Sequence, residues 1–209
     1  MSKDKKSTNN LRKKANEIKD FVCKNLIVVI ENPKSLANIG SIVRNVNALG
    51  AEKVYIIDNT NAFPDDWQDM RHWNPLVKPS ASAIKWSFVK KFTSPESCIE
   101  HLEKKGFTSI VTSPHIKGKN NVELAEGNFT HKKLAVWFGN ESKGVSDYAI
   151  EKSEMCVNIP MYGIIESLNL GTSSGIVLYE ITKQRREFEA RKKATNKTEE
   201  PIKKPQAAF

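Results

Sequence analysis

Short apolar runs that stop at loops of glycine and small polar residues recur in the second half of this 209-residue chain. Residues 134–138, LAVWF, end at Gly139, and residues 155–159, MCVNI, end at Pro160. Continuous apolar runs of this length are typical of strands buried on both faces of a parallel sheet. Open α/β sheets bind ligands in the loops that leave the carboxyl ends of such strands. We therefore expect a ligand at these two loops.

The first half of the chain alternates similar runs with segments of helical periodicity. Further strands are expected at residues 26–30, 53–58, 85–92 and 107–111. Helices are expected at residues 38–49, 94–105 and 174–189. The pattern predicts an α/β fold, with a mostly parallel sheet flanked by helices, in one domain over residues 26–190.

Two segments between these elements have no clear period. Residues 59–79 hold Trp67, Arg71, His72 and Trp73, and aromatic and basic side chains interleaved in this way can grip nucleic acid or pin a loop to the core. Both interpretations stay open at this stage. Residues 122–127 are expected to pack across the surface.

The basic charge is concentrated at the two ends. Residues 1–25 carry eight Lys/Arg against three Asp/Glu, and residues 183–209 carry nine against four, while the stretch between them is nearly neutral. Residues 11–23 can form a basic helix, so residues 1–25 are interpreted as an arm, and residues 191–209 are expected to be a disordered tail. Such ends are either solvated tails or attract a polyanion such as RNA.

Cysteine and histidine usage bounds the chemistry. Three scattered cysteines offer no disulfide framework, and neither they nor the four histidines have metal-ligand spacing, so we expect no metal and a reducing cytoplasm. The first residues lack the apolar core of a signal peptide, and no run approaches a membrane span.

Three motifs, taken in order, resemble those of the SpoU/TrmH family of RNA ribose 2′-O-methyltransferases, within the SPOUT superfamily. They are NIGSIVR at residues 38–44, FGNESKG at 138–144 and IPMYGIIESLN at 159–169. One departure follows the third motif, where residues 170–175, LGTSSG, hold more glycine and serine than the alanine-rich helix start usual in the family. The resemblance implies S-adenosylmethionine as cofactor, a deep trefoil knot at the carboxyl end and a homodimer with its sites near the subunit interface.

The resemblance also implies the site residues. Those matching the family's functional positions are Asn38, Arg44, Glu141, Ser167 and Asn169. Those expected around the cofactor are Thr112, Ser113, Gly139, Ile159, Met161 and Leu168. Asn38, Ser41 and Arg44 lie three apart, which stacks them roughly on one helix face, although Asn38 also suits a helix N-cap.

Arg44 has two readings within the family mechanism. The family proposal makes it a general base, but a guanidinium has a pKa above about 12 and rarely gives up its proton. We prefer the hypothesis that Arg44 holds the ribose or its phosphate and steadies the developing alkoxide, with a phosphate as proton acceptor.

For the substrate, the short basic arms most resemble the tRNA guanosine-18 enzymes. The alternatives are an enzyme acting on ribosomal RNA or on the tRNA wobble position, and a knotted RNA-binding protein without activity. Residues 171–175 also fit the G-x-S-x-G nucleophile elbow, but no Asp or His follows Ser173 to complete a hydrolase triad.

Overall fold

A seven-stranded sheet, parallel at every pairing, forms the centre of the described chain. The computed structural model describes residues 13, 16–19, 21–118 and 120–198, with side chains to residue 195. The strands are β1 Cys23–Glu31, β2 Ala51–Ile57, β3 Phe88–Phe92, β4 Thr108–Thr112, β5 Asn121–Glu123, β6 Leu134–Phe138 and β7 Met155–Asn158. Their order across the sheet is β3-β2-β1-β6-β4-β7-β5.

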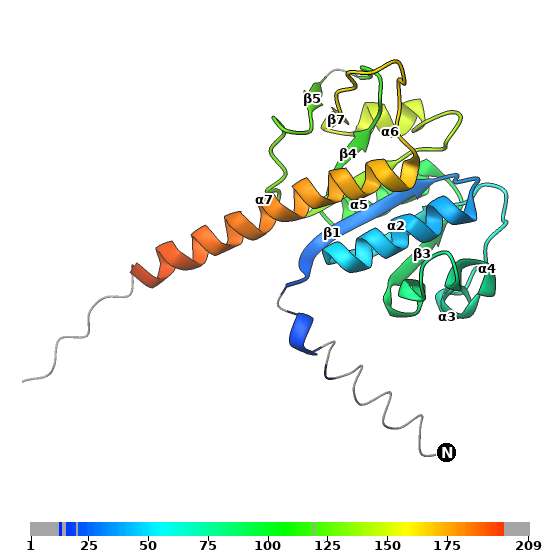
Figure 1. Ribbon diagram of the computed structural model, residues 1–209, viewed down its shortest axis with the longest axis horizontal. Helices are drawn as coiled ribbons and strands as arrows, with labels where there is room; N and C mark the ends of the chain where they lie inside the picture. Colours follow the sequence, from blue (N-terminus) through cyan, green and yellow to red (C-terminus); the bar gives the residue numbers. More distant parts are fainter. Residues whose placement is uncertain (1–12, 14–15, 20, 119, 199–209) are drawn as a thin grey trace, which may run out of the picture.

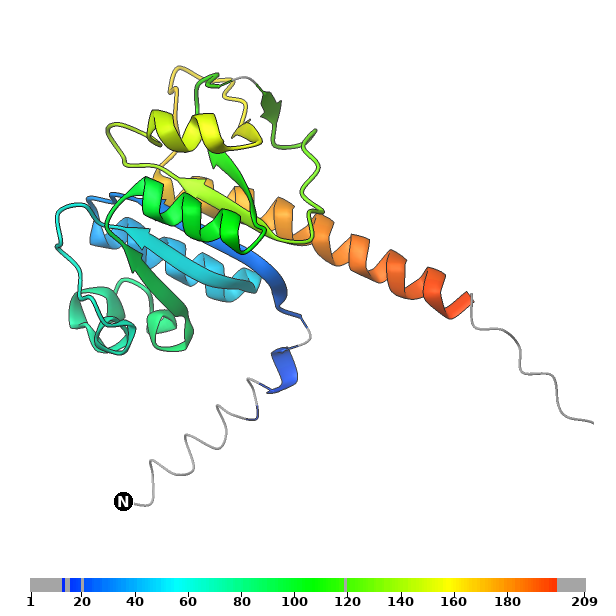
Figure 2. The same ribbon diagram turned by 180° about the vertical axis from the view of Figure 1, so that it is seen from behind.

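Helices cover both faces of this sheet. The helical segments are α2 Leu36–Leu49, α3 Trp67–His72, α4 Asn74–Val77, η1 Ala83–Trp86, α5 Pro95–Lys104, α6 Asp147–Lys152 and α7 Leu170–Thr198. Helices α2 and α7 lie side by side on one face, and α5 and α6 lie on the other (Figures 1 and 2). The predicted α/β class with a mostly parallel sheet is therefore confirmed.

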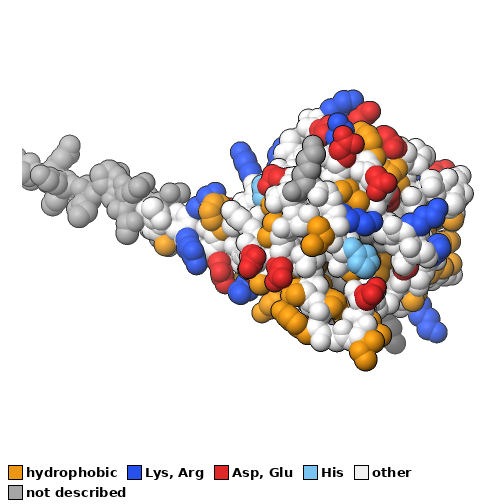
Figure 3. Space-filling view, turned by 90° about the horizontal axis from the view of Figure 1, so that it is seen from above, with side chains coloured by type: hydrophobic (Ala, Val, Ile, Leu, Met, Phe, Trp, Pro, Cys, Tyr) orange, Lys and Arg blue, Asp and Glu red, His pale blue; other side chains and the backbone are white. Residues whose placement is uncertain are grey.

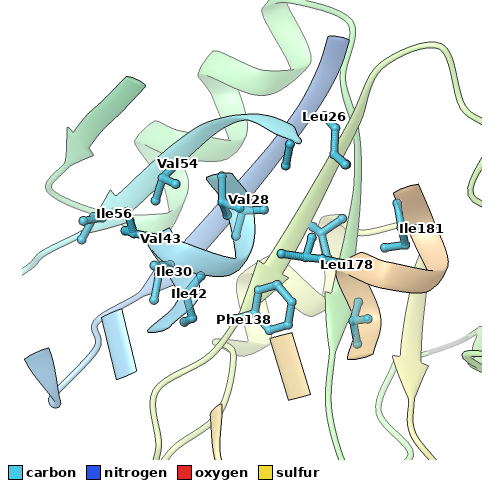
Figure 4. Close-up of a cluster of buried hydrophobic side chains, with 14 of the residues drawn as sticks. Leu26, Val28, Ile30, Ile42, Val43, Val54, Ile56, Phe138, Leu178 and Ile181 are labelled. Carbon is cyan, nitrogen blue, oxygen red and sulfur yellow. The ribbon is translucent and has the colours of Figure 1, made fainter. Parts of the chain in front are cut away.

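The central strand β1 supplies side chains to both layers. Leu26, Val28 and Ile30 are fully buried against α2 and α7, and Figure 4 shows them with Ile42 and Leu178 from those helices. The intervening residues of β1 point to the opposite face, where they join the core under α5 and α6. A strand buried on both faces cannot alternate polar and apolar residues, which explains the continuous run in the sequence.

The helix start and stop signals act at the expected places, with one correction. Ser94 caps α5 by accepting from the Ser97 backbone N–H, and Pro95 follows at the first helical position. Helix α2 ends at Gly50 in the left-handed conformation. Its N-cap, however, is Ser35, whose side chain accepts from the Asn38 N–H, so Asn38 lies inside the first turn and is free to use its side chain elsewhere.

Helix α7 is longer than predicted at both ends. It begins at Leu170 rather than Ser174 and continues to Thr198, so residues 191–198, which were assigned to the tail, are helical. The composition there suits a helix, and Lys192 lies over the Phe188 ring and near the Glu189 carboxylate. Residues 199–209 lie outside the described part of the chain.

Three other segments differ in detail from expectation. The short edge strand β5, Asn121–Glu123, overlaps the stretch 122–127 that was expected only to pack across the surface. The strand predicted over residues 85–92 begins only at Phe88. In the arm helix predicted over residues 11–23, residues 13 and 16–18 are helical, but Cys23 already belongs to β1, and residues 11, 12, 14, 15 and 20 lie outside the described part of the chain.

The aromatic residues of the 59–79 segment make contacts within the fold. Trp73 packs edge-on against the buried Phe63, Trp67 stacks on Phe88, and Arg71 lies over the Trp67 ring. These contacts attach α3 and α4 to the edge of the sheet, in agreement with the interpretation that this segment is pinned to the core.

The described surface has no large patch of one charge on the face seen in Figure 3, and the described residues hold no disulfide. Figure 3 shows acidic and basic side chains interspersed on the face seen from above. Cys23, Cys98 and Cys156 are free and buried. Across the described segments, none of the helices combines the length and the apolar character that crossing a membrane requires. Nor do these segments gather three potential ligands for a metal ion from His, Cys, Asp or Glu.

Candidate functional site

A cavity of about 490 Å³ opens at the carboxyl ends of β4, β6 and β7. Its walls come from the loop after β4, the 139–144 loop after β6 and the 159–169 segment after β7, with the first turn of α2 beside them. This is the place where loops of a parallel sheet bind ligands, and the volume falls within the ~300–1,000 Å³ usual for small-molecule sites.

Ten of the eleven predicted site residues line this cavity. They are Asn38, Thr112, Ser113, Gly139, Glu141, Ile159, Met161, Ser167, Leu168 and Asn169. Arg44 is not among the lining residues. It lies exposed on α2, six residues beyond Asn38, which turns it about 120° around the helix and moves it about 9 Å along the axis.

A chain of hydrogen bonds joins the 139–144 loop and the 159–169 segment through the first turn of α2. The Asn38 side-chain Nδ2 donates to Glu141 Oε1 at 3.0 Å, and the Asn169 Nδ2 donates to Asn38 Oδ1 at 2.9 Å. Glu141 also accepts from the backbone N–H groups of Lys34 and Ser35 at 3.0 and 3.1 Å. Residues more than 100 positions apart in the sequence thus fix one another's orientation.

Glu141 is held as a carboxylate by these donors. Partial burial alone would raise its pKa, but the hydrogen bonds from Asn38 and from the backbone at Lys34 and Ser35 outweigh burial and lower the pKa below its ordinary value. The negative charge also lies at the amino end of α2, where it interacts favourably with the helix dipole. Glu141 therefore works as an anchor for α2 and the 139–144 loop.

The 139–144 loop folds back on itself very tightly. Asn140 and Gly144 exchange two backbone hydrogen bonds of 3.0 and 2.8 Å, and Gly144 adopts a positive φ of 72°. The Asn140 side chain donates to the Asn32 carbonyl and accepts from the N–H groups of Ser142 and Lys143. A Cβ at Gly139 would lie 2.1 Å from the Gly144 carbonyl carbon, so only glycine fits at that position.

The other two loops are tied to the sheet and to α7. Thr112 Oγ1 donates to the Trp137 carbonyl at 2.8 Å, and the Ser113 N–H donates to the Val157 carbonyl. Asn169 Oδ1 accepts from the N–H groups of Gly171 and Thr172 and so caps the start of α7.

The small residues after Asn169 let α7 approach α2 closely. A Cβ at Gly171 would lie 2.7 Å from Ser41 Cβ, and Asn45 Nδ2 donates to the Gly171 carbonyl at 2.8 Å and to Ser174 Oγ at 3.0 Å. The glycine and serine that depart from the family pattern are therefore needed by this helix crossing. The same segment is helical, with Ser173 Oγ donating to the Leu170 carbonyl, so it is not the strand-to-helix turn of a hydrolase elbow.

Glu31 at the end of β1 holds the residue that begins α6. Its side chain is buried and both carboxylate oxygens lie 3.2–3.3 Å from the Ser146 N–H, at the start of α6. Burial raises the pKa of Glu31, and the hydrogen bond from Ser146 offsets this only in part. This contact could not be predicted from the sequence, in which Glu31 marks only the end of a strand.

Two polar side chains of the cavity were not anticipated from the sequence, those of His115 and Lys117. They follow Ser113 by two and four residues, and this proximity is the only signal that could have found them. The contact of Asn45 with the start of α7 was not predicted either, because the motif pointed to its neighbour Arg44.

The fold and the pocket define an α/β protein with a small-molecule site built from three loops at the carboxyl ends of parallel strands. The chain belongs to the SpoU rRNA methylase family, which matches residues 25–179. This confirms the family resemblance of the three motifs.

Named relatives agree with this assignment. The chain is 30% identical over 175 residues to tRNA (guanosine(18)-2′-O)-methyltransferase of Aquifex aeolicus, covering 84% of this chain and 77% of the relative. It resembles the crystal structure of the A. aeolicus TrmH/SpoU tRNA modifying enzyme with a TM-score of 0.68 and 27% identity, over 92% of this chain and 99% of the other. It also resembles the SpoU methyltransferase AviRb from Streptomyces viridochromogenes in complex with AdoMet, with a TM-score of 0.63 and 26% identity, over 77% and 57%.

Proposed function

We propose that this protein transfers a methyl group from S-adenosylmethionine to a ribose 2′-hydroxyl of RNA. The observation that carries the proposal is the hydrogen-bond chain from Glu141 through Asn38 to Asn169, which brings the three family motifs to one cavity. The named relatives support the reaction, since their printed names describe RNA 2′-O-methylation and a bound AdoMet.

The residues present fit the donor. The cavity combines backbone groups at the ends of three strands with apolar side chains from Ile159, Met161 and Leu168, a mixture suited to an adenosine. The bound donor supplies an electrophilic methyl group on a sulfonium. The protein's task is to orient the acceptor hydroxyl, which is a very weak acid, and to keep the two reacting atoms in line.

Asn38, Ser167 and Asn169 are the polar side chains we assign to that orientation, with Glu141 fixing Asn38. The carboxamides of Asn38 and Asn169 each face the cavity while bonded to one another, so neither can rotate without breaking a bond. Ser167 lies on the exposed 159–169 segment, two residues before Asn169, and offers a hydroxyl to the ribose or the donor.

Arg44 completes the site from a second copy of the chain. Its exposed position outside its own cavity supports this, as do the exposed apolar side chains around the cavity mouth and on α7, among them Tyr162 at 93%, Ile164 at 99% and Tyr179 at 61% exposure. In a homodimer that covers these side chains, Arg44 reaches the partner's pocket, where its guanidinium steadies the developing alkoxide or holds a phosphate.

Mixed dimers test this arrangement. Arg44→Ala and Asn169→Ala subunits, each with its own tag, are co-expressed and the mixed species is purified through both tags. If Arg44 acts across the interface, one of the two sites is intact and about half of the wild-type activity returns. If Arg44 acts within its own subunit, the mixed dimer is as inactive as either parent, and this part of the proposal is wrong.

We infer a trefoil knot at the carboxyl end. Helix α7 follows β7 in the chain, but it packs on α2 and β1, on the far side of β4 and β6. A knot requires the chain to cross back over earlier segments in this way. We also infer a cytoplasmic enzyme, in keeping with three unpaired cysteines.

For the substrate we propose guanosine 18 of tRNA, as the A. aeolicus relative's name indicates. The basic residues of the arm and of α7 would hold the RNA backbone. Transfer to a tRNA transcript is compared with transfer to the same RNA carrying 2′-deoxyguanosine at position 18. Loss of labelling in the modified RNA is expected. Equal labelling of both would instead favour another ribose of the tRNA, such as the wobble position, and labelling of neither would favour a ribosomal target.

A further inference from the structure

The loop after β4 places one ammonium group at the wall of the cavity. Lys117 is partly buried and lines the cavity, and its backbone N–H donates to Asn121 Oδ1 at 2.7 Å, which fixes the turn. Its Nζ lies 3.8 Å from where a Cβ on Gly144 would be, so the side chain reaches the tight loop after β6.

This ammonium has no counter-ion among the described residues. Lys53 is paired with Glu52 and Lys91 with Asp58 and Asp65, whereas the partly buried Lys90 and Lys133 contact His101 and the Lys105 carbonyl instead. Lys117 Nζ makes no salt bridge or hydrogen bond in the same part of the chain. A partly buried cation that faces a cavity without a partner favours an anionic group of the ligand.

We propose that Lys117 binds the α-carboxylate of the methyl donor. The inference rests on the proposed function and adds a binding residue to it. Lys117 follows β4, and its Nζ reaches the loop after β6, so the ammonium faces the cavity that we assign to the donor. The α-carboxylate is the one anionic group of the donor and is therefore the partner that we assign to Lys117, while an RNA phosphate is the alternative that the experiment separates.

Two nucleoside ligands show whether Lys117 contacts the carboxylate of the donor or only stabilises the shape of the cavity. S-adenosylhomocysteine carries the α-carboxylate, whereas 5′-methylthioadenosine keeps the adenosine and thioether but lacks the amino acid. Binding of each is measured by calorimetry with the full-length protein and with Lys117→Met, which keeps the length and apolar stem of the side chain. Lys132→Met, at an exposed lysine outside the cavity, is the control.

We expect Lys117→Met to weaken S-adenosylhomocysteine binding by about tenfold or more and to leave 5′-methylthioadenosine within about twofold, because only the first ligand loses a charge-assisted contact. Lys117→Arg restores most of the difference, and Lys132→Met changes neither ligand. Equal weakening of both nucleosides, or no weakening of either, overturns the inference. So does a variant that binds the donor normally and RNA more weakly, since its anion is then an RNA phosphate. Failure of the wild-type protein to bind S-adenosylhomocysteine contradicts the proposed function itself.

Discussion

Replacing Gly139 with alanine tests whether the tight loop after β6 builds the pocket. The new Cβ would lie 2.1 Å from the Gly144 carbonyl carbon and 2.2 Å from the Val145 nitrogen, and both are backbone atoms that cannot rotate away. The loop must open, which breaks the two hydrogen bonds between Asn140 and Gly144. Each bond contributes about 0.5–1.5 kcal/mol, and relieving the overlap costs about 1–3 kcal/mol.

The expected loss of about 2–6 kcal/mol corresponds to a fall in Tm of roughly 4–24 °C for a chain of this size. Thermal unfolding followed by circular dichroism measures it, and calorimetry with S-adenosylhomocysteine shows whether binding is lost as well. Gly163→Ala is the matched control, because nothing lies within 4 Å of the Cβ it adds in the neighbouring pocket loop. A Gly139→Ala protein that melts within about 1 °C of wild type would refute the steric reasoning.

Three further substitutions probe the supporting contacts. Asn45→Ala removes the bonds to Gly171 and Ser174 and should cost about 1–2 kcal/mol in urea unfolding, whereas Asn47→Ala, exposed on the same helix, should cost little; equal effects would count against the α2–α7 contact. Asn38→Ala should lower methyl transfer at saturating donor and RNA by about tenfold or more while the fold survives, and unchanged turnover would remove Asn38 from the site. Burial raises the pKa of Glu31 above its ordinary 4.5, so the folded state loses stability as the pH rises from about 4.5 through the raised pKa and Glu31 ionises. Glu31→Gln should therefore raise Tm relative to wild type more at about pH 8 than at about pH 4. A difference in Tm that does not depend on pH would contradict this.

Much of the fold was predictable because burial leaves a plain pattern. Residues 26–30 and 134–138 are apolar throughout because both faces of their strands are covered, and both runs lie in strands. The start of α5 followed from Ser94 and Pro95, whose capping roles depend only on local backbone geometry. Strand β5 escaped prediction because three residues at a sheet edge carry too little periodicity.

The start of α7 was misplaced for a different reason. Residues 170–175 are small and read locally as a loop, yet the helix needs them small where it crosses α2 at Ser41 and Asn45. Tertiary contact, which propensity cannot register, decided the structure there. The motifs gathered ten predicted residues at one cavity, but the pattern could not give the rotation of Arg44 around α2 or its absence from its own subunit's cavity.

The central claim is tested most directly by following labelled methyl groups from S-adenosylmethionine into unmodified tRNA and ribosomal RNA, and then identifying the methylated nucleoside. The account predicts a 2′-O-methylated ribose, formed by the wild-type protein and lost in Asn169→Ala. Label on a base, or label that survives in Asn169→Ala, would contradict the account, as would no transfer to any RNA by a protein that binds the donor.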